Sequence, residues 1–143
     1  MHDTDQQPIW DTLRRHLTAI FTGDADAYAE TTSEDLSLYE WYITPHRQDG
    51  LDFHLFLVRR AGPPPGHEVR YDLLEPRLQV YNDSAGAPFV AIASYTLMLT
   101  RATPEGVTHR SHNESRVLIR RDGAWRVVHA HKSPAWAAPF GPE

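Results

Sequence analysis

The sequence contains no cysteine among its 143 residues. It therefore has no disulfide framework, no thiolate zinc site and no cysteine nucleophile. Basic residues are also scarce, because 14 lysines and arginines stand against 19 acidic residues and give a net charge of −5. Nucleic-acid-binding proteins usually carry a basic surface, so this balance argues against a nucleic-acid partner.

Long apolar runs are missing as well. The most apolar stretch, residues 89–99, is interrupted by Ser94 and Thr96 and is shorter than the roughly 18 residues of a membrane span. The first residues lack the basic region and the apolar segment of a secretion signal. These absences predict a cytoplasmic protein that has no membrane partner.

The length is typical of one domain with a buried core. We expect a single domain over residues 1–143, with its core at about 8–133 and a proline-rich C-terminal arm at 134–143. Composition alone indicates nothing further about function.

The first half of the chain predicts mainly helices. Pro8 suits a first helical position, apolar residues recur at helical spacing through Phe21, and Gly23 ends the segment. Asp24 can cap a short second helix. Residues 51–60 are apolar nearly all round, which predicts a buried helix.

The remaining segments predict strands. Residues 36–42 alternate as a strand does, whereas Pro45 and Gly50 bound a predicted loop. Turn signals separate long antiparallel strands over residues 67–81, 89–101, 107–121 and 124–132. Pro76 predicts a bulge or an edge strand. The expected fold class is α+β, with N-terminal helices packed in the concave face of a curved antiparallel sheet.

Four motifs occur in order: Gly50-Leu-Asp-Phe-His54, Glu114-Ser-Arg-Val117, Arg120-Arg-Asp-Gly-Ala-Trp125 and Val128-His-Ala-His131. Together they resemble the association (hub) domain of calcium/calmodulin-dependent protein kinase II, within the nuclear-transport-factor-2-like, or SnoaL-like, superfamily. The resemblance extends over about residues 10–133. It implies a cone-shaped, cystatin-like α+β barrel that assembles through its sheet. Kinase activity is not expected, because the chain is short and lacks the Gly-rich phosphate loop and the His-Arg-Asp loop.

The same resemblance implies a deep cavity into which Arg116, Lys132 and His54 point. Lysine stands at 132 where the family usually has arginine, and a further family arginine corresponds to Leu97 or a neighbour. The cavity is therefore expected to be less cationic than that of a typical hub domain. It is also expected to be more aromatic, because Tyr39-Glu-Trp-Tyr42 replaces the common Phe-Glu-Pro-Glu.

Whether Arg116 and Lys132 share a face of the sheet depends on the turn at residues 122–123. A two-residue turn pairs Arg121 with Ala124 and directs the two cations to opposite faces. A three-residue loop with a glycine bulge shifts the register by one and directs them to one face. We expect the bulged turn, which leaves an apolar outer face for packing between protomers, formed by Val117, Ile119, Trp125, Val127, His129 and His131.

Each charged candidate has two interpretations. Arg116 could anchor a carboxylate through two parallel hydrogen bonds, with Lys132 as a second charge, or it could form an internal ion pair with Glu114. His54 could act as a general acid or base, or it could be a core histidine. The His129–His131 pair has the spacing of two metal ligands, but zinc needs a third, so we predict no metal site.

Two functions are therefore considered, and neither needs a cofactor. The first is a homodimer or larger ring that binds a small carboxylate-bearing molecule, with Arg116, Lys132, His54, Glu114, Tyr39, Trp41 and Tyr42 as ligand-binding residues. The second is a SnoaL-like isomerase, dehydratase, cyclase or hydrolase, with His54, Glu40, Glu114 and Tyr39 as catalytic candidates. A Glu114–Arg116 pair favours binding, whereas an unpaired carboxylate in the cavity favours an enzyme.

Overall fold

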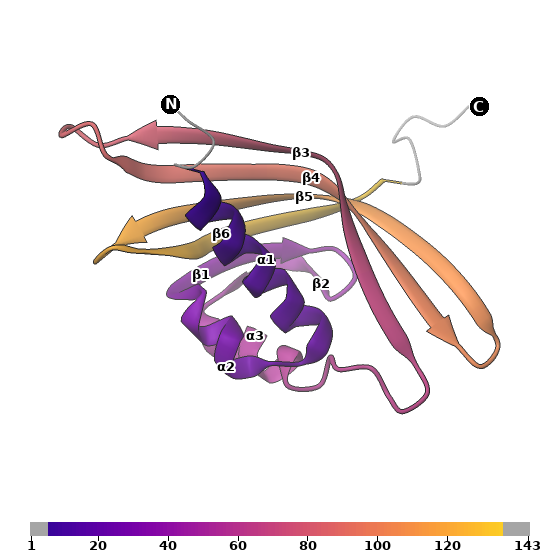
Figure 1. Cartoon of the computed structure of the whole chain (residues 1–143). Coiled ribbons are helices and arrows are strands. Elements are labelled where there is room, and N and C mark those ends of the chain that lie inside the picture. The colour runs from indigo at the N-terminus through magenta and orange to yellow at the C-terminus, as the bar shows by residue number, and fades with distance from the viewer. Residues whose placement is uncertain (1–5, 136–143) are drawn as a thin grey trace, which may run out of the picture.

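The computed structural model describes residues 6–135, which form three helices and one six-stranded sheet (Figure 1). The elements in chain order are α1 (Gln7–Thr22), α2 (Ala25–Glu30), β1 (Thr32–Glu40), β2 (Thr44–Asp49), α3 (Leu51–Val58), β3 (Glu68–Asn82), β4 (Pro88–Thr103), β5 (Gly106–Arg121) and β6 (Ala124–Pro134). The predicted arm at 134–143 lies almost wholly outside the described residues. No helix within residues 6–135 is long and apolar enough to cross a membrane.

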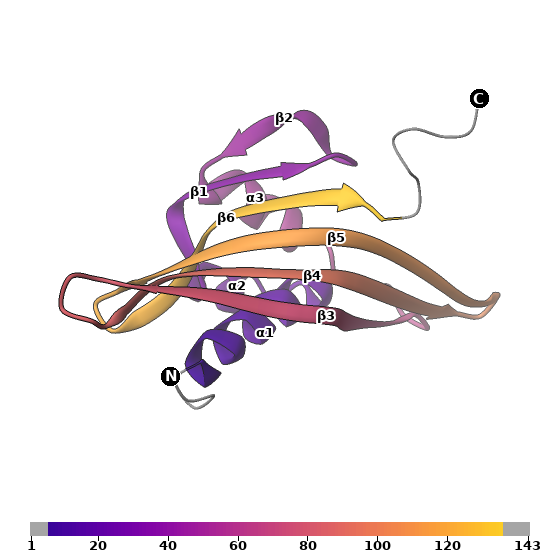
Figure 2. The ribbon, with the colours of Figure 1, turned by 90° about the horizontal axis from the view of Figure 1, so that it is seen from above.

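The sheet has the strand order β2–β1–β6–β5–β4–β3. It curves around the helices, which lie on its concave side, and it stays open with β2 and β3 as its edges (Figures 1 and 2). Neighbouring strands are antiparallel except β1 and β6, which are parallel. The prediction of an α+β fold is confirmed, but the sheet is mixed and does not close into a barrel. The last strand returns beside β1 and runs in its direction, which local strand patterns do not reveal.

The N-terminal helices form where local signals predict them. Gly23 ends α1 in the left-handed region at φ 76°, and its N–H bonds the Ala19 carbonyl. The Asp24 carboxylate then accepts a hydrogen bond from the Ala27 N–H at 3.1 Å and caps α2. The apolar face of α1 is buried, with Leu13 fully enclosed in the core.

The prediction of a buried helix over residues 51–60 is confirmed for one side of the helix and wrong for the other. Leu51, His54 and Val58 are buried in α3, but Phe53 and Phe56 are 48% and 47% exposed. Only one side of this short helix packs against β1 and α2, so its other side faces solvent.

Two edge features also follow from the sheet order. The predicted loop at residues 45–50 is largely strand β2, where Pro45 is tolerated because β2 lies at the sheet edge. Gln48 is the buried residue of β2, so the strand has no apolar alternation. At the opposite edge, β3 has a register shift between Leu74 and Arg77. The prediction from Pro76 is therefore confirmed as both a bulge and an edge strand.

The turn between β5 and β6 differs from the prediction. Arg121 pairs directly with Ala124, so the turn has two residues and is not bulged. The bulge lies further along, because Leu118 pairs with Val127 whereas Val117 pairs with His129. Residue 128 is therefore the extra residue in β6.

This bulge reverses the side-chain alternation within β6. Trp125 and Val127 precede it and are buried, and Ala130 and Lys132 follow it and are also buried. Arg116 and Lys132 therefore share the inner face, as predicted, but through a different bulge. The placement of Trp125 and Val127 on the outer face is wrong.

Candidate functional site

Four polar side chains form a row across the inner face of the sheet. Glu40 in β1 is paired with Lys132 in β6, Lys132 with Glu114 in β5, and Glu114 with Tyr95 in β4. All four are buried. Side chains of paired residues are in contact range, so each carboxylate has a cation within reach. We call Glu40, Lys132, Glu114 and Tyr95 the polar row.

Glu40 is surrounded by hydrogen-bond donors. Its Oε2 accepts from Lys132 Nζ at 2.6 Å and from the Tyr42 hydroxyl at 2.9 Å. Its Oε1 lies 3.0 Å from His54 Nε2 and accepts from the Gln48 amide at 3.2 Å. Burial alone raises the pKa of Glu40, but the His54 hydrogen bond and the Lys132 charge outweigh burial and hold this pKa well below its ordinary range. Glu40 is therefore an ionised and fully partnered carboxylate.

Glu114 is equally well partnered. Its Oε1 bonds Arg116 Nη1 and accepts from the Tyr95 hydroxyl at 2.7 Å, while its Oε2 bonds His112 Nε2. Burial raises the pKa of Glu114, but the Arg116 charge and the His112 hydrogen bond lower it well below the ordinary range. The Glu114–Arg116 ion pair is thus present, and neither carboxylate of the polar row is unpaired.

Arg116 and His54 are buried in the core beneath the polar row. Arg116 is completely buried between Ala93 in β4 and Ala130 in β6, whose small side chains leave room for the guanidinium. His54 is held by Glu40, and its ring centroid lies 5.0 Å from that of Tyr28. Neither residue lines the pocket above the polar row.

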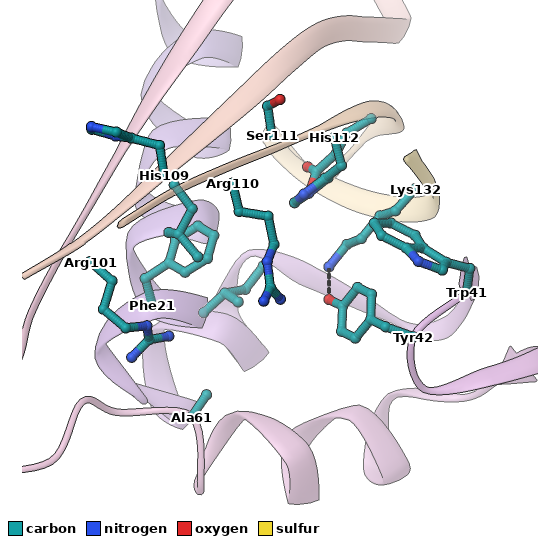
Figure 3. A pocket seen from close by; sticks show the side chains of 13 residues that line it. Phe21, Trp41, Tyr42, Ala61, Arg101, His109, Arg110, Ser111, His112 and Lys132 are labelled. Carbon is teal, nitrogen blue, oxygen red and sulfur yellow. Dashed lines mark hydrogen bonds and ion pairs between the residues drawn. The ribbon is translucent and has the colours of Figure 1, made fainter. Parts of the chain in front are cut away.

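That pocket has a volume of about 730 Å³ and opens beside α1 (Figure 3). Its lining consists of Ile20, Phe21, Trp41, Tyr42, Ala61, Leu99, Arg101, His109, Arg110, Ser111, His112, Glu114 and Lys132. Four of the predicted ligand-binding residues are therefore brought together here, namely Trp41, Tyr42, Glu114 and Lys132. Tyr39 does not line the pocket. It lies on the outer face of the sheet, where the centroid of its ring is 5.1 Å from that of the His131 ring.

The predicted ligand-binding set left out five polar residues that line the pocket, namely Arg101, His109, Arg110, Ser111 and His112. Arg110 and His112 lie on the inner face of β5, at the same alternating positions as Glu114 and Arg116. Arg101 approaches from β4, and both arginine side chains point into the pocket (Figure 3). The two-residue period that places Glu114 inward could have identified Arg110 and His112.

The pocket is consequently cationic and has an apolar wall. Within residues 6–135 neither Arg101 nor Arg110 forms an ion pair, whereas Lys132 and Arg116 are each paired with a carboxylate. Phe21 and Leu99 supply apolar surface. Such a pocket suits a small anion with an apolar part. The same described segment holds no group of three or more metal-ligating His, Cys, Asp or Glu side chains.

Known proteins share this fold and sequence pattern. Residues 5–136 match the family described as calcium/calmodulin dependent protein kinase II association domain. The chain is 28% identical over 138 residues to the delta subunit of calcium/calmodulin-dependent protein kinase type II from Oryctolagus cuniculus, covering 96% of this chain but 25% of that protein. It thus spans about a quarter of that relative's length.

Solved structures share the fold of this chain. The association domain of C. elegans CaMKII superposes with a TM-score of 0.78 at 22% identity, covering 91% of this chain and 95% of that one. A nuclear transport factor 2-like superfamily protein from Salmonella enterica superposes with a TM-score of 0.73 at 20% identity, covering 98% and 97%. With the family pattern matched over nearly its whole length, this chain belongs to the calcium/calmodulin-dependent protein kinase II association domain family.

Proposed function

We propose that this association domain forms a homodimer or larger ring, that it binds a small organic acid in its pocket, and that the domain itself has no kinase activity. The observation that carries the proposal is the difference between the two sets of cations. Lys132 and Arg116 are neutralised by the two carboxylates of the polar row. Arg101 and Arg110, by contrast, face the pocket without a carboxylate partner among residues 6–135.

In this proposal the anion is held mainly by Arg110 and Arg101. A guanidinium offers a carboxylate two parallel hydrogen bonds, which fixes the orientation of the ligand. Lys132 contributes further, because its ammonium has three protons and directs two of them to Glu40 and Tyr42. The third proton remains for a ligand. The predicted anchor Arg116 is assigned a structural role instead, since it is buried and already paired with Glu114.

Thermal unfolding with a panel of small carboxylates tests this proposal. At a ligand concentration about one hundred times its dissociation constant, binding adds about 2.7 kcal/mol to the free energy of unfolding. We expect Arg110→Gln to abolish this stabilisation. The matched control is Arg59→Gln, which removes the same charge from an exposed position at the end of α3, outside the pocket lining, and should retain the stabilisation. Equal stabilisation of wild type and Arg110→Gln would contradict the proposed anion site.

Self-association is proposed to use the outer face of β5 and β6. Val117 and Ile119 on β5 are half-buried there, beside His129 on β6, and Tyr39 of β1 extends the face. We expect Ile119→Glu to dissociate the oligomer in analytical ultracentrifugation. Phe53→Glu is the control, since Phe53 is an exposed apolar side chain on α3. Dissociation by Phe53→Glu alone would place the interface on α3 instead.

A further inference from the structure

His112 combines two properties that no other described histidine combines. It lines the pocket, and its Nε2 bonds the buried carboxylate of Glu114. By contrast, His54 bonds Glu40 but lies outside the pocket lining, with its Nδ1 buried and unpartnered. His109 lines the pocket, but its Nδ1 bonds the Thr100 hydroxyl and no carboxylate.

The bond to Glu114 determines which nitrogen of His112 can act as a base. Glu114 is an ionised acceptor, so the Nε2 of His112 carries the proton in this hydrogen bond. In the neutral ring the lone pair is then on Nδ1, and the side-chain hydrogen bond that His112 forms within residues 6–135 uses Nε2 alone. A carboxylate that fixes the tautomer of a histidine in this way is a common arrangement behind a general base.

The ring is held from two sides. Behind it, Glu114 is itself fixed by Arg116 and by the Tyr95 hydroxyl. In front of it, the Trp41 ring packs edge-on with a centroid distance of 5.6 Å. A histidine oriented by contacts of this kind does not need to reorganise before it accepts a proton.

The neighbours of His112 indicate which substrate could present a proton to it. Arg110 lies two residues before His112 on the same face of β5, so the backbone positions of the two residues are about 7 Å apart along the strand. A carboxylate held by Arg110 therefore places the next carbons of a short chain near His112. The Lys132 ammonium, paired across the sheet with Glu114, lies where it can donate to an oxygen of the same molecule.

We propose that the pocket catalyses keto–enol proton transfer in a small 2-oxo carboxylic acid, with His112 as the general base. The proposal rests on the anion site proposed above. His112 Nδ1 takes a proton from the carbon beside the ketone, and the C–H electron pair forms the C=C bond. The C=O π pair moves to oxygen, where the Lys132 ammonium stabilises the enolate. Return of a proton to carbon restores the ketone, so no oxidant or second reactant is needed.

The test is hydrogen–deuterium exchange of pyruvate and 2-oxobutanoate in D2O, followed by the loss of their C3 proton signals in NMR. Wild type should accelerate the loss over buffer, and His112→Gln should reduce the acceleration by at least about 100-fold, the usual contribution of a general base. The control is His46→Gln, which changes an exposed histidine of β2 and should exchange like wild type. Binding of each acid is measured separately by calorimetry.

The outcomes separate the two proposals. Binding without exchange above buffer, or equal exchange by wild type and His112→Gln, overturns proton transfer and leaves the anion site standing. If no 2-oxo acid binds, both the anion site and the proton transfer are overturned for this class of ligand. Glu114→Gln tests the positioning role, since it should slow exchange even though loss of the negative charge in the pocket lining should tighten binding of the anion, in protein that retains a cooperative unfolding transition. Exchange of the bound acid at the wild-type rate in that variant contradicts the positioning role.

Discussion

Replacing Arg116 by alanine should destabilise the fold without removing a ligand contact. The guanidinium is fully buried and bonds both Glu114 and the Tyr95 hydroxyl. Its loss leaves the Glu114 carboxylate in the core with His112 and Tyr95 but without its cation. Breaking a buried ion pair from one side typically costs about 3–5 kcal/mol. That is a large part of the roughly 5–15 kcal/mol that stabilises an ordinary domain.

Thermal and urea unfolding monitored by circular dichroism at neutral pH measure this loss. For a chain of this length we expect Tm to fall by about 10 °C or more. The control Arg59→Ala removes an exposed arginine at the end of α3 and should stay within about 0.5 kcal/mol of wild type. Removing both partners, in Glu114→Leu combined with Arg116→Met, should cost less than the two single changes together, because no uncompensated buried charge remains.

The result that refutes this reasoning is specific. If Arg116→Ala unfolds within about 1 kcal/mol of wild type and yet loses binding of every carboxylate, Arg116 is a ligand anchor. The internal ion pair would then be weak, and Arg110 would not be needed to explain an anion site.

Three further predictions concern the charged core and the bulges. The folded-state pKa values of Glu40 and Glu114 lie below the ordinary value of 4.5. Their contribution to the free energy of unfolding is therefore present above pH 4.5 and is lost as the pH falls below it. Unfolding measured at a series of pH values should show this free energy decreasing by up to about 1.4 kcal/mol per pH unit for each group. Deleting Val128 should remove the bulge but leave Lys132 paired with Glu114 on the inner face, because Val127 and His129 would then face the consecutive residues Leu118 and Val117; we expect this variant to retain a cooperative transition in urea unfolding. Glu75 has a φ of 50°, so Glu75→Asn should be neutral or stabilising in urea unfolding and Glu75→Ile should cost about 1 kcal/mol or more.

The features that could be predicted from the sequence depend on neighbouring residues. Gly23 and Asp24 end one helix and begin the next through contacts within a few positions, so their roles are visible in the sequence. Pro76 likewise indicates a bulge at an edge, whichever strand lies beside it.

The features that were missed depend on distant partners. The bulge at residue 128 is set by how β6 fits between β5 and β1, and no glycine or turn residue indicates it. The exposed side of α3 is apolar in sequence, so burial could not be inferred from its composition. The family resemblance placed Arg116 on the inner side of the sheet, but which inward charges are neutralised depends on Glu114 beside it and on Glu40 in another strand.

Parallel pairing of β1 with β6 also sets the point in folding at which the pocket can exist. Strands β3 to β6 are joined by short connections and can zip together as successive hairpins. The contact between Lys132 and Glu40 instead joins positions 92 residues apart, so it forms only when the last strand meets one of the first. Until then Lys132 and Glu40 remain hydrated and unpaired. We therefore expect the pocket floor to assemble in the final, slowest step of folding, after most of the sheet has formed.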